Sequence, residues 1–548
     1  MGKLIVVSNR VGPLRDSGRA GGLAVGLVDA LRRRGGLWFG WSGEISEEGT
    51  FGKLRLDEAK AVQTATIDLS PADHAEFYAG YANRTLWPVL HYRLDIADFD
   101  RRFEQGYRRV NERFAARLKP MIGAGDIVWV HDYHFFRLGA ELRAAGVETP
   151  IGFFLHITFP GPEILAALPN HTALLRAMLA YDVIGFQTER DRAAFVRCLA
   201  EDLGVVEHGD GVVECMGRRV TVKAFPIGID AAAFAGYAVS AEGRAHARRI
   251  EKTLVGRRQI IGVDRIDYSK GLVERFRAFE RLLEDYPENR GKVSFIQVAP
   301  PSRGEVDAYI DMRRSLERLA GHVNGRFADI DWTPIRFLTR SFPRKALAGL
   351  YRSSEIGLVT PLRDGMNLVA KEFVAAQDPE SPGVLVLSRF AGAAEQMREA
   401  LIVNPYSAEG VAEALQSALR MPLDERKDRW RRMFERMRAN DAHGWAETVL
   451  ELLTATRRGG GEERAAATGA APAQPSAAVT ATDAAARGES GGSDASKTDA
   501  SKIGAGKAGA SQTGASQTGA SKAGAARKTA AGAATGTDAW PRKASTGR

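Results

Sequence analysis

The sequence predicts an α/β protein made of two doubly wound, Rossmann-like domains that face a cleft, followed by a disordered tail. Short apolar segments alternate with longer segments of helical spacing, which is typical of a parallel sheet covered by helices on both faces. F-P-I-G-I-D, at residues 225–230, ends a first series of such segments, and a charged helical stretch starts a second. We therefore expect an N-terminal domain over residues 1–228 and a C-terminal domain over 229–456.

The rest of the chain, residues 457–548, has a different composition. It consists mainly of Ala, Gly, Ser and Thr with scattered charges, including D-A-S-K-T-D-A-S-K. Such a segment has too little apolar surface to offset the entropy of ordering the chain. We therefore expect a disordered tail, and we expect the last helix before it to pack back on the N-terminal domain.

The charge of the chain is concentrated in this tail. Residues 457–548 hold 13 Lys and Arg and 7 Asp and Glu, a net charge of +6, which leaves +3 of the total of +9 for the folded part. A nucleic-acid-associated tail is the alternative from another functional class. Its charge is spread over a long segment with acids interspersed, so phosphate neutralisation would be weak and salt-sensitive, and nucleic acid is not an expected partner.

Cysteine content and hydropathy indicate the compartment. Two cysteines, Cys198 and Cys215, are too few for a disulfide framework and fit a reducing cytoplasm. The N-terminus has no signal-peptide pattern, and no run of 18 apolar residues occurs. We expect a cytoplasmic protein with no membrane partner, and a homo-oligomer is compatible with this sequence.

The first domain is expected to open with a strand over Lys3–Ser8, a loop reaching Gly21-Gly22, and a helix that ends before Gly35-Gly36. Glycines at the start of a helix let a phosphate or a sugar approach the backbone closely, although a Gly-Gly pair is more often a plain turn. Three tryptophans follow within a short stretch: Trp38, Trp41 and Trp87. Indole faces stack on pyranose rings, whereas core packing is the alternative.

Two further strands of this domain are expected to end in histidines. G-D-I-V-W-V-H-D-Y-H places His131, Asp132 and His134 at a strand end, and I-G-F-F-L-H does the same for His156. His131 and His134 are three apart at a strand end, with no cysteine and no H-E-x-x-H pattern nearby. This favours polar contacts with a sugar over a metal site.

In the second domain, residues 358–372 (L-V-T-P-L-R-D-G-M-N-L-V-A-K-E) predict a strand end, a tight loop and a helix start. In an open α/β sheet, ligands bind at such places, because the first turn of the helix favours an anion such as a pyrophosphate. We expect Glu372 about two turns into the helix, where its carboxylate could accept hydrogen bonds from sugar hydroxyls. An ordinary strand-to-helix turn with a capping Asp is the alternative on the local pattern alone.

Several motifs occur in one order: V-S-N-R (7–10), G-G-L (21–23), T-L-W-P with H-Y-R-L-D (85–95), W-V-H-D-Y-H (129–134), D-R-I-D-Y-S-K-G (264–271), P-S-R-G-E (301–305) and L-R-D-G-M-N-L-V-A-K-E (362–372). Together they strongly resemble the α,α-trehalose-phosphate synthase (UDP-forming) family. Its members are retaining GT-B glycosyltransferases that join the glucose of UDP-glucose to glucose 6-phosphate. The resemblance covers residues 3–450 and implies the GT-B fold and this activity, with no cofactor and no metal.

The resemblance also implies a role for each matching position. Arg265 and Lys270 match the pyrophosphate ligands, Asp364 a contact to the glucosyl hydroxyls, Glu372 the ribose ligand, and His156 a histidine beside the transferred sugar. We expect Asp364, Arg265, Lys270 and His156 to be the catalytic residues. The donor site would be completed by the loop Gly21, Gly22 and Leu23, by Phe342 on the uridine side, and by Gly365, Met366, Asn367, Leu368 and Val369. The acceptor residues would be Arg10, Trp41, Tyr78, Trp87, Asp132 and Arg303.

One position departs from the family pattern, and two aspects of the reaction stay open. The family usually has H-I-P-F-P where this chain has H-I-T-F-P, so Thr158 replaces a proline, and we expect a looser loop around His156. The motifs supply no evident carboxylate nucleophile of the kind a retaining glycosidase uses, which favours front-face transfer. A related enzyme with glycerol 3-phosphate as acceptor, or with another nucleotide-glucose donor, is the alternative function.

Overall fold

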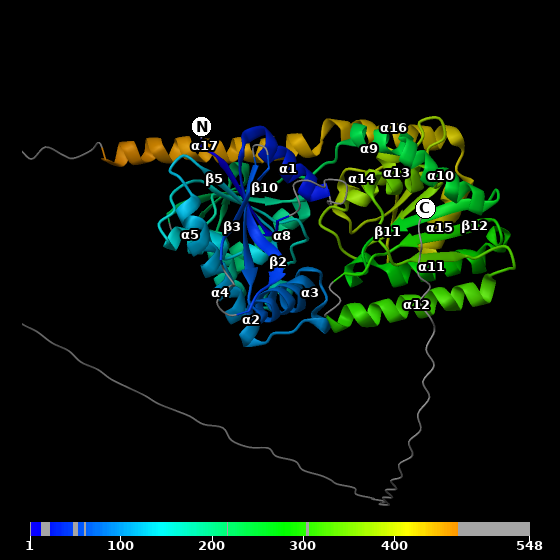
Figure 1. The fold of residues 1–548 in the computed structure, drawn as a ribbon, viewed down its shortest axis with the longest axis horizontal. Helices are drawn as coiled ribbons and strands as arrows, with labels where there is room; N and C mark the ends of the chain where they lie inside the picture. The colour runs from blue at the N-terminus through cyan, green and yellow to red at the C-terminus, as the bar shows by residue number, and fades with distance from the viewer. Residues whose placement is uncertain are drawn as a thin grey trace, which may run out of the picture. The chain divides into compact units, whose positions relative to one another are not determined.

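The computed structural model describes residues 2–11, 22–47, 53–59, 62–215, 217–302 and 306–468. Within these residues the chain forms two sheets, one of ten strands and one of six, with helices against both (Figure 1). This arrangement is the doubly wound α/β architecture predicted from the sequence. None of the described helices combines the length and the apolar character that crossing a membrane requires.

The N-terminal sheet has the strand order β3-β4-β2-β1-β5-β6-β7-β10-β9-β8. Its central strands are parallel, and the antiparallel pairs lie at its two edges. The strands span Leu4–Arg10 (β1), Gly36–Ile45 (β2), Arg55–Ala59 (β3), Val62–Leu69 (β4), Ile127–His131 (β5), Ile151–Phe154 (β6), Val183–Phe186 (β7), Glu207–His208 (β8), Val212–Cys215 (β9) and Arg218–Ala224 (β10). The central strands are buried along their length, which is why they are apolar runs without alternation.

The helices of this part fill the connections between the strands. They are α1 (Gly22–Arg34), α2 (Pro71–Asp73), the π-helix η1 (His74–Leu86), α3 (Trp87–Leu90), α4 (Arg101–Leu118), α5 (Leu138–Ala144), α6 (Pro162–Leu165), α7 (His171–Met178) and α8 (Glu189–Leu203), with short 3₁₀ turns at Leu94–Ile96, Lys119–Met121, Tyr133–Phe135 and Gly209–Gly211. Side chains cap the first turn of several of these helices. At α8, the hydroxyl of Thr188 accepts a hydrogen bond from the backbone N–H of Asp191.

The C-terminal sheet is parallel throughout, with the order β13-β12-β11-β14-β15-β16. Its strands are β11 (Arg258–Val263), β12 (Val293–Val298), β13 (Ile335–Leu338), β14 (Ile356–Val359), β15 (Val384–Ser388) and β16 (Leu401–Val403). Its helices are α9 (Ala231–Val239), α10 (Ala241–Leu254), α11 (Leu272–Asp285), α12 (Asp307–Phe327), α13 (Arg344–Arg352), α14 (Leu368–Ala376), α15 (Ala408–Arg420) and α16 (Leu423–Ala439), with 3₁₀ turns at Tyr268–Lys270, Pro287–Asn289 and Gly392–Glu395.

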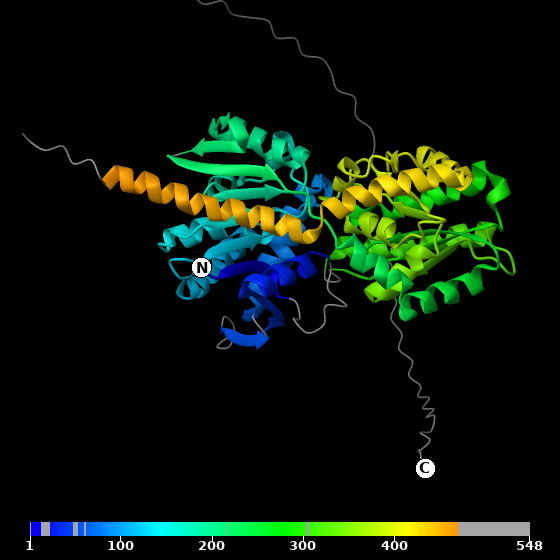
Figure 2. The ribbon, with the colours of Figure 1, turned by 90° about the horizontal axis from the view of Figure 1, so that it is seen from above.

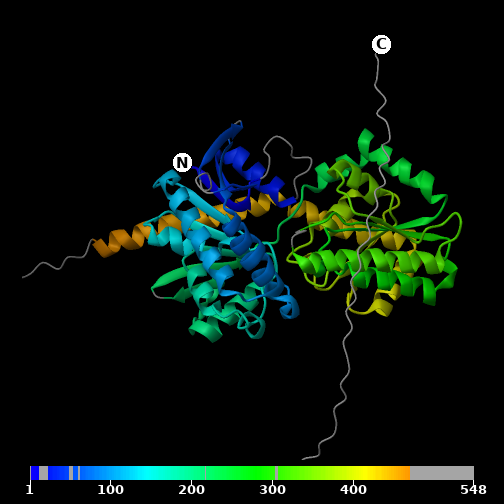
Figure 3. The same cartoon turned by 60° about the horizontal axis from the view of Figure 1, so that its bottom comes forward.

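Two apolar layers enclose this second sheet. Helices α11, α12 and α15 pack on one face around Phe276, Phe279 and Leu415, and α12 runs alongside α11 (Figure 3). Helices α9, α13, α14 and α16 pack on the other face, around Phe373 and Met437. The sheet is therefore buried on both sides, and its functional residues must lie at the strand ends.

The last described helix, α17 (Ala442–Thr468), contacts the N-terminal sheet although it follows the C-terminal one (Figures 1 and 2). Trp445 lies 5.0 Å from Trp129 and 5.1 Å from Phe154 between ring centroids. Glu447 forms an ion pair with Arg34 at the end of α1. The helix continues past residue 456, where the folded part was predicted to end, and residues 469–548 of the predicted tail lie outside the described residues.

Candidate active site

Polar side chains gather at the carboxyl ends of the parallel strands in both sheets. In the first sheet, Asp132 directly follows β5, one residue separates His156 from the end of β6, and Arg10 is the last residue of β1. In the second, the segment 264–270 follows β11 and the segment 360–367 follows β14. Since the carboxyl edge of such a sheet is where ligands bind, both sets of residues are placed for recognition.

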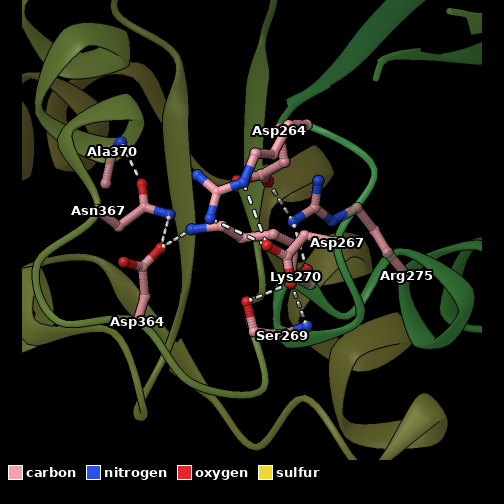
Figure 4. A network of polar contacts seen from close by, with 9 residues as sticks. Asp264, Asp267, Ser269, Lys270, Arg275, Asp364, Asn367 and Ala370 are labelled. Carbon is pink, nitrogen blue, oxygen red and sulfur yellow. Dashed lines mark hydrogen bonds and ion pairs between the residues drawn. The ribbon is translucent and has the colours of Figure 1, made fainter. Parts of the chain in front are cut away.

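The loop after β11 is held by an internal carboxylate (Figure 4). Oδ1 of Asp267 accepts hydrogen bonds from the backbone N–H and the hydroxyl of Ser269, at 3.0 and 2.9 Å. Oδ2 of the same residue accepts from Nε and Nη2 of Arg265, at 3.1 and 2.9 Å. Asp267 is fully buried, so its charge is matched by these donors, and the Arg265 guanidinium is fixed near the surface of the loop.

The buried guanidinium of Arg275 supports this loop. Nη2 of Arg275, on α11, lies 2.9 Å from Oδ2 of Asp264 (Figure 4). Nη1 donates to the Gln297 side chain at 2.9 Å. Nη2 also donates to the backbone oxygen of Lys270 at 3.3 Å. The backbone of the loop after β11 is therefore tied to the sheet through a side chain that is itself almost fully buried.

The loop after β14 begins a helix. Asn367 has a positive φ of 76°, and its Oδ1 accepts a hydrogen bond from the N–H of Ala370 at 3.0 Å, which caps α14. Its Nδ2 donates to Oδ2 of Asp364 at 2.9 Å. The capping residue of this helix is thus an Asn rather than the Asp considered from the local pattern.

An ion pair between Lys270 and Asp364 joins the two loops (Figure 4). Burial alone would raise the pKa of Asp364, but attraction to Lys270 and hydrogen bonds from Lys270 and Asn367 outweigh it and lower the pKa. The Asp364 carboxylate is therefore ionised at neutral pH and able to accept hydrogen bonds.

Glu372 lies in α14, little more than one turn from its start rather than the two turns expected. Burial raises its pKa to about 7, and Nη2 of Arg344, 4.0 Å away, opposes that rise. Next to it, Lys371 is buried, and its ammonium donates to the backbone oxygen of Ile227 and to the Gln396 side chain, both at 2.6 Å. Lys371 thus ties α14 to the segment that connects the two sheets.

The imidazole of His156 contacts two buried neutral side chains, His131 and Gln187. Its Nε2 is 3.0 Å from Nδ1 of His131 and its Nδ1 is 3.2 Å from the Gln187 amide nitrogen, while its backbone N–H donates to Asp132 Oδ1 at 3.3 Å. Burial lowers the pKa of His156 to about 3. The imidazole is therefore neutral at physiological pH and acts as a hydrogen-bonding group rather than as a cation.

Thr158 is buried, and its hydroxyl donates a hydrogen bond to the backbone oxygen of Leu90 at 2.6 Å. A proline could not form this bond. The loop around His156 thus has an anchor on α3 that the sequence-based expectation of a looser loop did not include.

The two sets of loops meet at Gly365. A Cβ atom there would lie 2.3 Å from the backbone oxygen of His156 and 2.8 Å from Cα of Ile157, so only glycine permits this approach. Two arginines cross the same boundary: the Arg265 guanidinium lies 5.0 Å from the Trp87 ring centroid, and that of Arg363 lies 3.5 Å from that of Tyr92. The donor residues predicted from the second domain therefore lie against His156 and Trp87 of the first.

A second cluster, Arg10, Trp41 and Tyr78, lies on β1, β2 and η1. The Arg10 guanidinium is 5.6 Å from the Trp41 ring centroid, and the Trp41 and Tyr78 rings are 5.1 Å apart. Tyr78 also stacks on His134 at 6.2 Å with an interplanar angle of 12°. An arginine that lies over one ring of an aromatic cluster is suited to a sugar phosphate.

The remaining expected residues have less definite surroundings or lie outside the described residues. Phe342 lies in the loop after β13, under the guanidinium of Arg340 at 4.7 Å. Gly22 and Leu23 begin α1, whereas Gly21 and Arg303 lie outside the described residues. Met366 lies in the turn before α14, and Leu368 and Val369 are the first residues of that helix.

Three residues of the site were not found from the sequence. Arg275 looks like a surface residue of an amphipathic helix, and Arg344 is remote in sequence from Glu372, so neither gives a local signal. His91 stacks on Trp87 at 4.1 Å, and burial lowers its pKa to about 4, although nearby Asp267 opposes this. His91 belongs to a motif noted in the sequence, H-Y-R-L-D, and this was the one available indication.

The model of glycosyltransferase family 20 matches residues 10–455. The chain belongs to glycosyltransferase family 20. A trehalose-6-phosphate synthase of Enterobacter sp. (strain 638) is 48% identical over 457 residues, covering 83% of this chain and 96% of that protein. Among the residues described in this family member, no three His, Cys, Asp or Glu side chains gather as metal ligands.

Solved structures of trehalose-phosphate synthases also resemble this member of family 20. The UDP-forming α,α-trehalose-phosphate synthase from Burkholderia xenovorans, in complex with glucose-6-phosphate, has a TM-score of 0.80 and 48% identity, covering 83% of this chain and 100% of that one. The E. coli structure bound with UDP-2-fluoro glucose has a TM-score of 0.79 and 46% identity, covering 82% and 99%. The GT-B fold predicted from the sequence is therefore confirmed.

Proposed function

We propose that the protein transfers glucose from UDP-glucose to glucose 6-phosphate, with retention, to give α,α-trehalose 6-phosphate and UDP. Its family and its trehalose-6-phosphate synthase relatives support this proposal. So do the ligands of the matching structures, which are glucose-6-phosphate in one and a UDP-glucose analogue in another.

The observation that carries the proposal is the contact, at Gly365, between the residues at the strand ends of the first sheet and those at the strand ends of the second. It places Lys270 and Asp364, on one side, against the His156 loop on the other. A glucosyl donor held by the first set would therefore present its sugar to the second. Such proximity converts the transfer into an effectively unimolecular step.

On the donor side, we assign Lys270 and Arg265 to the pyrophosphate. Both cations belong to one rigid loop, fixed by Asp267 and Arg275, so they stabilise the negative charge that develops on departing UDP without reorganising. The ionised carboxylate of Asp364 accepts hydrogen bonds from the glucosyl hydroxyls, and Glu372 accepts those of the ribose. We assign Gly365 to Val369, Phe342 and the loop of residues 21–23 to the donor as well.

On the acceptor side, we assign Arg10, Tyr78 and Arg303 to the phosphate of glucose 6-phosphate. Arg10 already lies over Trp41, whose ring contacts Tyr78, so the phosphate would bind next to aromatic faces that accommodate the ring. Trp87 and Asp132 would hold the acceptor sugar near His156, whose backbone N–H already bonds to Asp132. The aromatic frame favours a hexose phosphate over glycerol 3-phosphate.

The chemistry that fits these groups is front-face transfer through an oxocarbenium-like state. Asp364 is engaged by Lys270 and Asn367, and Asp132 by the His156 backbone, so both carboxylates fit sugar-binding roles rather than nucleophilic attack. The leaving phosphate oxygen takes the proton of the acceptor hydroxyl. His156 would lie beside the transferred sugar as a neutral ring, with its two nitrogens held by His131 and Gln187.

A substrate matrix tests the proposal. The purified protein is assayed with UDP-, GDP- and ADP-glucose against glucose 6-phosphate and glycerol 3-phosphate, and products are identified by mass and by NMR of the anomeric linkage. We expect α,α-trehalose 6-phosphate from UDP-glucose and glucose 6-phosphate. Turnover with glycerol 3-phosphate but not with glucose 6-phosphate would establish the alternative acceptor instead.

We also propose a cytoplasmic location. Cys198 and Cys215 are both free, and Cys198 is buried, as expected for a protein that folds in a reducing compartment. Alkylation of both thiols in the unfolded protein, freshly isolated under trapping conditions, would agree with this location, whereas recovery of an oxidised cysteine pair would contradict it.

A further inference from the structure

A cavity of about 550 Å³ lies at the end of the C-terminal sheet opposite to the donor loops. Ser354 and Glu355 line it just before β14 begins, and Asp378 and Ser381 line it between α14 and β15. Because this sheet is parallel, the amino ends of its strands are at the edge away from the carboxyl ends. The cavity is therefore separate from the candidate active site, and its volume is in the range of small-molecule sites.

Four arginines from three helices converge on this cavity. Arg244 and Arg248 lie one turn apart on α10, Arg352 ends α13, and Arg426 lies on α16. Guanidinium groups bind phosphate in a forked geometry, so a cluster of this kind is suited to a phosphate group.

Part of this positive charge has no partner in the described part of the chain. Arg352 is engaged, since Nη2 donates to Asp378 at 2.8 Å and Nη1 donates to the backbone oxygen of Gln377 at 3.1 Å. The side chains of Arg244 and Arg248 are exposed and form no hydrogen bond or ion pair with a described residue. Nη1 of Arg426 donates to Pro382, but its Nε is buried without a partner among the described residues.

The remaining lining groups fit hydroxyls rather than a second anion. Glu251 has no ion-pair partner among the described residues, and Glu355 is paired with Arg258 at 2.5 Å, so each carboxylate can still accept hydrogen bonds. Ser353 and Ser381 add hydroxyl groups. A ligand that combines one phosphate with several hydroxyls matches both kinds of lining.

We propose that this cavity binds a small phosphorylated polyhydroxy compound, either a sugar phosphate or a nucleoside monophosphate. Arg244, Arg248 and Arg426 bind the phosphate, and the carboxylates and serines bind hydroxyls of the sugar or the ribose. The site is additional to the donor and acceptor sites of the transfer reaction.

Three elements connect the cavity with the donor site. Helix α13 has Arg352 in the cavity and Arg344 beside Glu372, and α14 runs from Asn367 toward Asp378. Strand β14 follows Glu355 and leads to the loop of Asp364. A ligand that shifts α13 or α14 therefore alters donor affinity, and by linkage the donor alters ligand affinity equally. This coupling, unlike the binding itself, rests on the proposed function.

Calorimetric titration of the full-length protein tests the binding. The probes are inorganic phosphate, ribose 5-phosphate and AMP, and the proteins are wild type, the double variant Arg244→Ala/Arg248→Ala, and Arg249→Ala. Arg249 is a matched control, because it is exposed on the same helix but does not line the cavity. A second variant, Arg248→Glu, reverses one charge at an exposed helical position, and melting temperatures confirm that each variant is folded.

We expect ribose 5-phosphate or AMP to bind the wild type saturably, and the preferred one identifies the ligand as a sugar phosphate or a nucleotide. The double variant and Arg248→Glu should weaken that binding at least about tenfold, as loss of charged phosphate contacts implies, with Arg249→Ala unchanged. Equal affinity in wild type and double variant, no saturable binding, or organic phosphates binding no tighter than inorganic phosphate would overturn the proposal.

The coupling has its own readout. The KM for UDP-glucose is measured with and without the bound compound, and it should change in the wild type but not in the double variant. A KM that stays constant while the compound is bound would overturn the coupling. If the protein proved to have no transferase activity, the titrations would still decide whether the cavity binds phosphate compounds.

Discussion

At the scale of single residues, the site depends on a few buried charges that neutralise one another. Lys270 and Asp364 are both largely buried, so the charge of each is stabilised mainly by the opposite charge of the other. Removing one member of such a pair leaves an uncompensated buried charge, which costs more than the pair contributes. The pair therefore holds two groups of the proposed donor site in place before any substrate binds.

We expect Lys270→Ala to lower kcat by about 10²–10³, the usual effect of removing one group that stabilises developing negative charge. The KM for glucose 6-phosphate should change little, because we assign Lys270 to the donor. Steady-state kinetics in both substrates measure this, with Lys427→Ala as control, since Lys427 pairs with the exposed Glu380. A kcat close to wild type would contradict the assignment of Lys270 to the leaving group.

Thr158 is a residue whose hydroxyl, rather than its shape, is expected to matter. Thr158→Val keeps the branched side chain but leaves the buried backbone oxygen of Leu90 without its partner, which costs about 1–2 kcal/mol of unfolding free energy. Thr158→Ser keeps the donor and should lose less. Urea unfolding of the three proteins tests this prediction, and equal stability of the valine variant would show that the hydrogen bond contributes nothing.

Glu372 should make the stability of the protein depend on pH. Burial raises its pKa from 4.5 to about 7, so the folded state holds this proton more tightly than the unfolded state. Its contribution is greatest below about pH 4.5, declines as pH rises toward 7 and is constant above; at about 1.36 kcal/mol per pKa unit, the loss is up to about 3 kcal/mol.

The variant Glu372→Gln cannot ionise, so its stability relative to wild type should increase by about 2 kcal/mol between pH 5 and pH 8. Urea unfolding followed by tryptophan fluorescence at both pH values measures the difference. Glu435→Gln, at an exposed position, is the matched control. A difference that does not change with pH would mean that Glu372 titrates as it does in the unfolded chain.

At the scale of elements, α14 depends on the residue that starts it. We expect Asn367→Ala to cost about 2 kcal/mol, because it removes the cap and places an alanine at a φ of 76°. Asn367→Gly tolerates that φ and should cost less than half as much. Both variants lose the hydrogen bond to Asp364, so their kcat/KM should fall together even though their stabilities differ. A glycine variant with wild-type kcat/KM would exclude a role for that bond.

The strands and the strand-end positions could be predicted from the sequence because buried parallel strands are short apolar runs bounded by loop residues. The segment 358–372 shows both the success and the limit. Its strand, its loop and its helix start were predicted correctly, whereas the π-helix His74–Leu86 and the continuation of α17 to Thr468 have no periodicity that distinguishes them from other helical segments.

Only those residues of the site that belong to sequence motifs could be predicted. The positions of Lys270 and Asp364 follow from two separate motifs, but nothing local shows that the two side chains form an ion pair. Arg275 and Arg344 contact residues that are distant in sequence, and their burial depends on tertiary packing rather than on neighbouring residues. The cavity near Arg244 is defined by helices far apart in sequence, so no motif could indicate it.

At the scale of the whole molecule, the chain crosses from one sheet to the other more than once. The segment around Ile227 leads to the second sheet and is held by Lys371, and α17 returns to the first. Leu453 of α17 fits against Gly152, where a Cβ atom would lie 2.6 Å from its side chain. Elements from both ends of the sequence therefore complete the N-terminal half.

This arrangement predicts different effects for two truncations. A chain ending at Thr468 should keep the full kcat/KM, because the family match ends at residue 455 and α17 is intact. A chain ending at Asp441 should be insoluble or inactive, since it exposes the apolar surface that Trp445, Val449 and Leu453 cover. Activity and melting temperature of the two chains beside the full-length protein measure this. Lower activity in the chain ending at Thr468 would show that residues 469–548 take part in catalysis, and full activity without α17 would show that the helix is dispensable.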